Sequence, residues 1–122
     1  MSKKVMVVDD SSAIRQSLCF SLKSAGYEVV EAANGVDALN LMKQHSIGLF
    51  ISDVNMPEMD GITLLKKIKE DKDYSCTPVI MLTTEKSGDI INEGKSAGAR
   101  AWMIKPFGPD QLLDAVKKLF VV

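Results

Sequence analysis

Residues 4–10 read Lys-Val-Met-Val-Val-Asp-Asp, a short apolar and β-branched run that ends at two adjacent acids. An uninterrupted run of this kind is typical of a strand that is covered on both faces, as in a parallel sheet. We therefore predict a strand over residues 4–8, with Asp9 and Asp10 directly after its carboxyl end. Ligands of open parallel sheets bind at that edge.

The residues after the two acids carry a helical pattern. Ser11 or Ser12 is a suitable N-cap, and Ile14, Leu18 and Leu22 recur every four residues on one side. Residue spacing of this kind predicts an amphipathic helix whose apolar side faces the sheet. A helix thus follows the first strand.

The same strand-helix unit recurs to the end of the chain. Five strands that alternate with five helices through short loops imply right-handed crossovers and a parallel sheet with helices on both faces. The fold class is therefore α/β, doubly wound, and for the five-stranded order 2-1-3-4-5 the binding edge lies between strands one and three. The further strands are expected at 28–32, 49–52, 79–82 and 101–104, and the further helices at 36–44, around Ile62, Leu65 and Ile68, at 89–97 and at 109–119.

One helix is expected to be looser than the others. The segment 89–97 has Gly94 in its interior, and an interior glycine costs about 1 kcal/mol relative to alanine. We predict that this helix is the least stable of the five.

Composition limits the class of protein. The 122 residues suit one domain, residues 1–122, with no output domain, and 46% hydrophobic and 25% charged residues are ordinary for a globular protein. A formal net charge of -1 argues against nucleic acid as a partner. There is neither a membrane-length apolar run nor a signal peptide, so a cytoplasmic protein without membrane insertion is expected. Cys19 and Cys76 are interpreted as free thiols.

Polar side chains follow four of the predicted strands. Asp9 and Asp10 follow the first strand, Asp53 the third, Thr83 the fourth and Lys105 the fifth. Each has an ordinary explanation alone, such as helix capping or a turn, but their joint position on one edge indicates a site. Three neighbouring carboxylates favour a hard divalent cation, Mg²⁺, which commonly shares its ligands with a phosphate. A carboxylate can act as the nucleophile toward phosphorus.

At this point the sequence resembles the response regulator receiver domains, and within them the single-domain CheY-like chemotaxis regulators. The resemblance covers the whole chain and implies their flavodoxin-like (βα)5 fold of order 2-1-3-4-5. The motifs that carry it are Val8-Asp9-Asp10, Ser52-Asp53-Val54-Asn55-Met56-Pro57 with Asp60-Gly61, Met81-Leu82-Thr83-Thr84 and Lys105-Pro106-Phe107.

The resemblance implies roles for the residues of this edge. Asp53 is the expected phosphoacceptor, and the Mg²⁺ ligands are Asp10, Asp53 and the backbone carbonyl of Asn55, with Asp9 acting largely through water. Lys105 is expected to pair with the phosphate, and the Lys105-Pro106 peptide to be cis.

It also implies a switch. Thr83 is the expected switch hydroxyl, and an aromatic residue three positions before the lysine, here Trp102, moves inward with it. In the family this position is more often Tyr or Phe. Without the resemblance, Trp102 would be interpreted as a partly buried packing residue of its strand. The side chains of Asn55 and Glu85 are expected to affect the rate of dephosphorylation.

The function implied is a phosphorylation-activated signalling switch rather than an enzyme. Its partners would be a CheA-like sensor histidine kinase, a protein target such as the flagellar motor switch, and a phosphatase. The target would bind the face formed by the fourth helix, the fifth strand and the fifth helix. The chain is expected to be a monomer. A phosphorelay intermediate or phosphate sink is the main alternative. A small Mg²⁺-dependent phosphatase would need an Asp-x-Asp motif, and Asp53-Val54-Asn55 lacks the second acid of that motif. A flavin carrier would have to bind a phosphate group in its first loop, and Asp9 and Asp10 would repel that phosphate.

Overall fold

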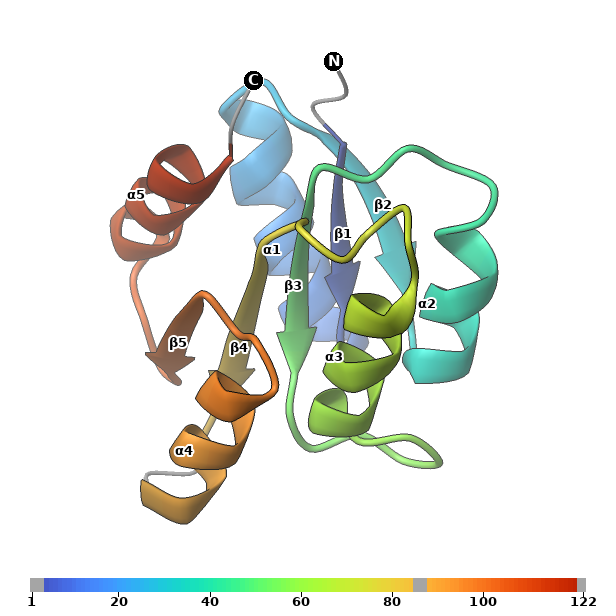
Figure 1. Cartoon of the computed structure of the whole chain (residues 1–122). Coiled ribbons are helices and arrows are strands. Elements are labelled where there is room, and N and C mark those ends of the chain that lie inside the picture. The colour runs from blue at the N-terminus through green and yellow to red at the C-terminus, as the bar shows by residue number, and fades with distance from the viewer. Residues whose placement is uncertain (1–3, 85–87, 121–122) are drawn as a thin grey trace.

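A computed structural model describes residues 4–84 and 88–120, in which five strands and five helices alternate (Figure 1). The strands form one parallel sheet in the order β2-β1-β3-β4-β5. The predicted fold class and strand order are confirmed. The elements are β1 (Lys4–Val8), α1 (Ser12–Ser24), β2 (Glu28–Ala32), α2 (Gly35–Leu41), β3 (Leu49–Asp53), α3 (Gly61–Glu70), β4 (Val79–Thr83), α4 (Gly88–Ser96), β5 (Ala101–Ile104) and α5 (Pro109–Leu119).

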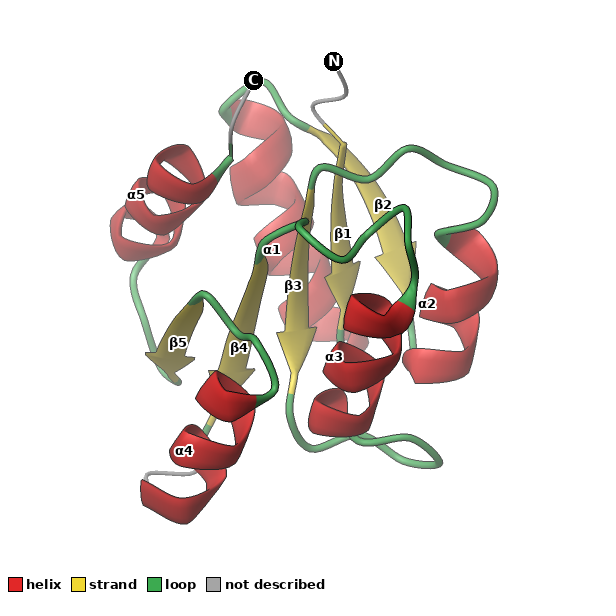
Figure 2. Cartoon of the chain, viewed as in Figure 1, coloured by secondary structure: helices red, strands yellow, loops and turns green. Residues whose placement is uncertain are grey.

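The helices form two layers over the sheet. Figures 1 and 2 show α1 and α5 on one face and α2, α3 and α4 on the other. Alternate residues of the strands point to opposite faces, so each layer has its own hydrophobic core. Leu22 of α1 and Val116 of α5 pack with Ile51 in one core, and Leu65 of α3 packs with Phe50 in the other.

Polar caps fix where several helices begin. Ser11 Oγ accepts a hydrogen bond from the backbone N–H of Ile14 at 3.3 Å, which satisfies an otherwise free donor of α1. Asp60 caps α3 in the same way through Thr63. Partial burial would raise the pKa of the Asp60 carboxyl, but hydrogen bonds from Thr63 and Ile62 outweigh it and hold that pKa below its usual value.

Two strands are one residue longer than predicted. β3 includes Asp53 and β4 includes Thr83, so both side chains are fixed by the sheet rather than by a loop. The buried side of α1 is shorter than predicted. Leu18 and Leu22 are buried as expected, but Ile14 is exposed at the sheet edge.

Helix α2 was predicted over 36–44 but ends at Leu41. After Leu41, some backbone N–H groups donate to carbonyls three residues earlier in place of four, as in the bond from the Gln44 N–H to the Leu41 carbonyl at 3.0 Å. The Tyr74 hydroxyl lies 2.6 Å from the carbonyl oxygens of both Met42 and His45, at the place where a longer helix would continue. Tertiary contacts from Tyr74 therefore stabilise an early end that local sequence did not indicate.

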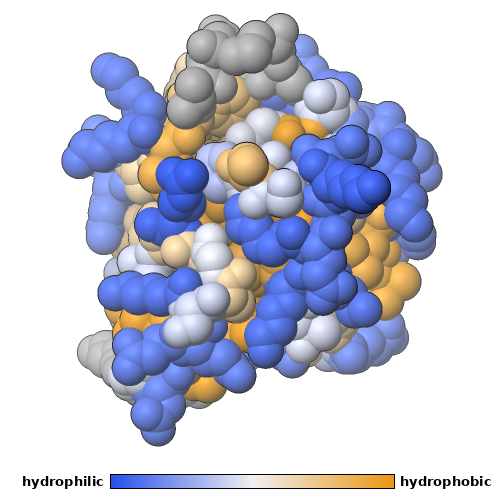
Figure 3. Space-filling model, viewed as in Figure 1, coloured by the Kyte–Doolittle hydropathy of each residue, from blue (hydrophilic) through white to orange (hydrophobic). Residues whose placement is uncertain are grey.

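Helix α4 is amphipathic and lightly covered. Within its described length, Gly88–Ser96, the one buried residue is Gly94. Figure 3 shows hydrophilic side chains over most of the face that carries α3 and α4. In the ranges that the structure describes, no helix has the length and apolar character to cross a membrane.

Candidate functional site

The carboxyl ends of β1 and β3 bring three acids together. Asp9 and Asp10 directly follow β1, and Asp53 is the last residue of β3, the neighbouring strand. One carboxylate oxygen from each lies within 4.8 Å of the others. Asp9 is fully buried and Asp53 is 7% exposed, whereas Asp10 is open to solvent. The predicted cluster of acids is present.

Lys105 closes the site from the opposite side of the rim. It directly follows β5, and its backbone N–H donates to the Thr83 carbonyl at 2.8 Å. Its Nζ lies 3.2 Å from Asp9 Oδ2 and 3.4 Å from Asp53 Oδ2. The ammonium group thus bridges two carboxylates that belong to different strands. The Lys105-Pro106 peptide is cis, as the resemblance implied.

The charges at the rim are unbalanced. In their charged forms, the three carboxyl groups and the Lys105 ammonium group together carry two net negative charges, which one divalent cation would neutralise. Burial raises the pKa of the Asp53 carboxyl, and the charge of Asp9 adds to this effect, while Lys105 and a hydrogen bond from the Asn55 backbone act against it. Ionisation of the Asp53 carboxyl is therefore less favourable in this site than in water.

Asp9 is held by contacts that sequence reasoning missed. Arg15 Nη1 donates to the Asp9 carbonyl at 2.7 Å, and Arg15 Nε pairs with Glu31 at 3.1 Å. The backbone N–H of Ser11 donates to Asp9 Oδ1 at 2.9 Å. The available signal was an arginine one turn into the helix after the acids, with an acid near the end of the next strand.

The loop after Asp53 lies tightly against it. A Cβ on Gly61 would be 2.8 Å from Val54 Cα and would also collide with the Asp53 carbonyl, so only glycine allows α3 to begin here. The Gly61 N–H donates to the Val54 carbonyl at 2.7 Å. Within this loop Glu58 has φ of 68°, which is unfavourable for a residue with a side chain.

The remaining predicted residues occupy different environments. Thr83 is fully buried at the end of β4, and Asn55 is exposed in the loop after β3. Trp102 lies on β5 beside Met81 and packs against the core under α3 and α4. Because Met81 and Thr83 are two residues apart on one strand, Trp102 and Thr83 point to the same face of the sheet. Glu85 lies outside the described residues.

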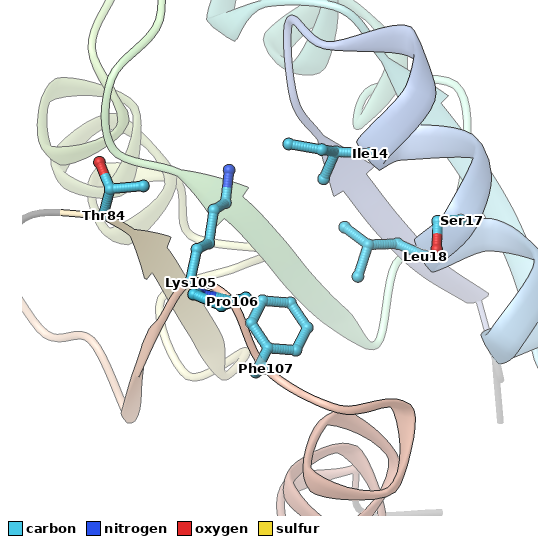
Figure 4. A pocket seen from close by; sticks show the side chains of 7 residues that line it. All are labelled: Ile14, Ser17, Leu18, Thr84, Lys105, Pro106 and Phe107. Atoms are coloured by element: carbon cyan, nitrogen blue, oxygen red, sulfur yellow. The ribbon is translucent and has the colours of Figure 1, made fainter.

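A pocket of about 410 Å³ is lined in part by Lys105, the residue that contacts Asp9 and Asp53. Figure 4 shows Ile14 and Leu18 from α1 on one side and Phe107 on the other, with Lys105 and Thr84 nearby. Its lining is mainly apolar, and the pocket is open to solvent. Sequence reasoning did not identify this pocket, because its walls come from α1 and from the loop after β5, about 90 positions apart.

The sequence matches a known protein family over most of its length. The model of the response regulator receiver domain matches residues 5–117. The chain belongs to this receiver domain family. Phosphorylation-dependent switching is the general function of receiver domains. Three curated relatives, all named chemotaxis protein CheY homolog from Campylobacter jejuni, are 38% identical over 116 residues, which is 93% of this chain and 89% of theirs.

Solved structures agree with this assignment. The receiver domain superposes on chemotaxis protein CheY4 of Vibrio cholerae with a TM-score of 0.93 and 43% identity, over 98% of this chain and 99% of that one. A response regulator receiver domain protein (CheY-like) from Methanospirillum hungatei gives a TM-score of 0.90 at 31% identity, over 97% of this chain and 93% of that one.

The residues at the rim fit a divalent metal ion. Receiver domains bind Mg²⁺ at an acidic pocket, and the carboxylates of Asp9, Asp10 and Asp53 are the hard oxygen donors that this ion prefers. The open side next to Asp10 leaves room for water and phosphate oxygens. These acids could therefore hold the ion without rearrangement of the strands.

Proposed function

We propose that this receiver domain accepts a phosphoryl group on Asp53 from a phosphohistidine of a sensor histidine kinase, with Mg²⁺, and so changes its affinity for a protein target. The observation that carries the proposal is the bridge from Lys105 Nζ to Asp9 and Asp53, beside the exposed carboxylate of Asp10. A cation and a nucleophile are thereby aligned on one solvent-accessible edge.

The chemistry follows from the residues of the rim. An Asp53 carboxylate oxygen forms the new bond to phosphorus as the phosphorus–nitrogen bond of the donor breaks, and the released imidazole takes a proton from solvent. Lys105 stabilises the negative charge on the phosphoryl oxygens. Mg²⁺ held by Asp10, Asp53 and the Asn55 carbonyl, with Asp9 contributing through water, would supply further neutralisation of that charge. Because the protein residues only align and neutralise, the domain acts as a switch and catalyses nothing beyond its own phosphorylation and dephosphorylation.

The apolar pocket supports transfer from a protein donor. Its walls, Leu18 and Phe107 among them, lie next to the Lys105 side chain, which is 13% exposed. An incoming helix that carries a phosphohistidine could bury apolar side chains there while its phosphate reaches the acids.

The switch itself would connect Thr83 to Trp102. Phosphorylation adds about one further negative charge, because a phosphate carries roughly -1.5 to -2 at pH 7. Thr83 ends β4, the strand next to β3, and Trp102 points to the same face one strand away. Movement of the hydroxyl toward the phosphate would free space for the indole and alter the surface of α4, β5 and α5. The side chains of Asn55 and Glu85, two positions beyond Asp53 and Thr83, would affect the rate of hydrolysis of the acyl phosphate.

Chemotaxis is the pathway that we propose. The curated relatives carry that name at 38% identity, and the solved structure at 43% identity is a chemotaxis protein. The domain would then act in the cytoplasm as a monomer, between a CheA-like kinase and the flagellar motor switch, with a phosphatase ending the signal. Tighter binding of motor-switch fragments after phosphorylation would support this pathway, and unchanged binding of all of them would exclude it.

Phosphorylation can be tested with a small donor. After incubation with acetyl phosphate and Mg²⁺, mass spectrometry should find one phosphoryl group, on Asp53, and chelation of the metal by EDTA should prevent it. Asp53→Asn should abolish the modification. Asp114→Asn makes the same change on exposed α5 and should leave it intact. An unchanged yield in Asp53→Asn, or with EDTA, would refute the assignment.

A further inference from the structure

The indole of Trp102 lies directly against α4 at Gly94. A Cβ added to Gly94 would be 2.9 Å from Cη2 and 3.0 Å from Cε3 of the indole, and closer still to Cζ3. Real carbon atoms do not approach so closely, and the obstacle is a large rigid ring. Trp102 can therefore occupy this position only because residue 94 has no side chain.

The backbone gives no other reason for a glycine at this position. Among the described glycines, Gly26 and Gly98 have positive φ, whereas Gly94 does not. Alanine would also be the better helix former in the middle of α4. The contact with Trp102 is therefore the structural reason that residue 94 lacks a side chain.

In this position the buried indole N–H of Trp102 has no hydrogen-bond partner among the described residues. In residues 4–84 and 88–120, Trp102 Nε1 is the one buried side-chain nitrogen or oxygen atom that has no hydrogen-bond partner. The ring is held by packing against α4 and the core, while its N–H forgoes the hydrogen bond that water would provide. Packing and hydrogen bonding thus favour different positions of the same side chain.

We propose that Gly94 is a positioning residue of the switch. The space above its backbone holds the Trp102 indole against α4, and the fit between the two residues sets the balance between this position and one in which the ring has left the helix. The consequence for signalling rests on the proposed function, because phosphorylation at Asp53 would shift this balance through Thr83.

The packing part of the proposal can be tested without phosphate. Trp102 is the only tryptophan of the chain, so its fluorescence reports on this contact. Gly94→Ala should displace the ring from α4, shift its emission to longer wavelength and raise its acrylamide quenching constant at least twofold. Gly88→Ala is the matched control, because it places the same methyl group in the same helix with nothing within 4 Å. Equal emission and quenching in both variants would overturn the proposal.

A second measurement covers the case in which Gly94→Ala folds poorly. Trp102→Phe removes the outer part of the ring system and makes room for a methyl group at position 94. Gly94→Ala should lower the melting temperature when Trp102 is present but not in the Trp102→Phe background. Recovery of the fold in the double variant would support the contact, and an equal effect of Gly94→Ala in both backgrounds would contradict it.

The signalling part is tested with acetyl phosphate and Mg²⁺. In the wild type, phosphorylation should change the Trp102 emission, and Gly94→Ala should reduce that change at least twofold while Gly88→Ala retains it. Mass spectrometry measures the modification of Asp53 in the same samples. Full phosphorylation with a wild-type emission response in Gly94→Ala would refute the positioning role. Absence of phosphorylation in the wild type would instead refute the proposed function, and the phosphate-free measurements would still decide the packing claim.

Discussion

The centre of the sheet and its β5 edge are built differently. Strands β3 and β4 are buried along their whole length and end in Asp53 and Thr83. Strand β5 has one buried residue in four, Met103, and the helix beside it has Gly94 as its one buried residue within the described range. The centre is closely packed around the acids, whereas the edge has little buried surface to hold it.

This difference suggests a division of work between the two regions. Phosphoryl chemistry requires carboxylates and a cation in fixed positions, and fully buried strands supply this rigidity. A binding surface that responds to phosphorylation needs two accessible arrangements, which a lightly packed helix allows. The following experiments challenge this comparison, beginning with the largest expected effect.

Matched truncations should separate the two regions most strongly. Ile68 in α3 is fully buried, whereas Ile90 in α4 is only half-buried. Ile68→Ala should lower the free energy of unfolding by about 3–4 kcal/mol, because it leaves a cavity, and Ile90→Ala by about 1 kcal/mol. Urea unfolding followed by circular dichroism measures both. Similar losses would show that α4 is packed as firmly as α3, contrary to the comparison.

The acids of the centre should destabilise the domain when no metal ion is bound. Burial raises the pKa of Asp53, so its ionised form opposes folding at neutral pH. In EDTA, Asp53→Asn should therefore raise the free energy of unfolding by about 1 kcal/mol, the scale of a buried polar group that is poorly solvated.

The pH dependence gives the sign of this effect. The pKa of Asp53 is higher in the folded state than in the unfolded state. The stabilisation by Asp53→Asn should therefore be complete at pH values above the folded-state pKa. The gain should disappear as the pH falls below the unfolded-state value of 3.8, where Asp53 is protonated in both states. Addition of Mg²⁺ at neutral pH should stabilise the wild type and not the variant. A gain that persists unchanged at low pH would contradict the electrostatic explanation.

Sequence patterns predicted the ends of the strands better than features that depend on tertiary contacts. The acids, the threonine and the lysine follow apolar runs, and strand ends of a parallel sheet meet at one edge, so their proximity could be inferred. The end of α2 could not, because it depends on Tyr74, about 30 positions further along the chain. The contact between Gly94 and Trp102 could not be predicted either, because it joins a helix to the side chain of a neighbouring strand. An interior glycine indicates a loose helix, and only the tertiary structure shows the ring that lies against it.

Strain in the loop after β3 should be measurable as well. Glu58 has φ of 68°, where glycine is favoured by about 1 kcal/mol over a residue with a side chain. Glu58→Gly should therefore raise the free energy of unfolding by about 0.5–1 kcal/mol. Glu70→Gly makes the same change at the helical end of α3 and should lower it by up to about 1 kcal/mol. A loss in Glu58→Gly would show that the left-handed conformation is not strained.

The smallest effect concerns the ion pair between α3 and α4. Lys66 Nζ lies 3.9 Å from Glu93 Oε2, and both side chains are 54% exposed, so water and salt screen their attraction. A double-mutant cycle of Lys66→Ala and Glu93→Ala should give a coupling energy of at most about 0.5 kcal/mol, and less in high salt. Such a value would mean that the ion pair adds little to the attachment of α4, which then depends mainly on the packing of Trp102 and its neighbours. A coupling above about 1 kcal/mol would instead show that α3 holds α4 in place, and the β5 edge would be more rigid than its burial indicates.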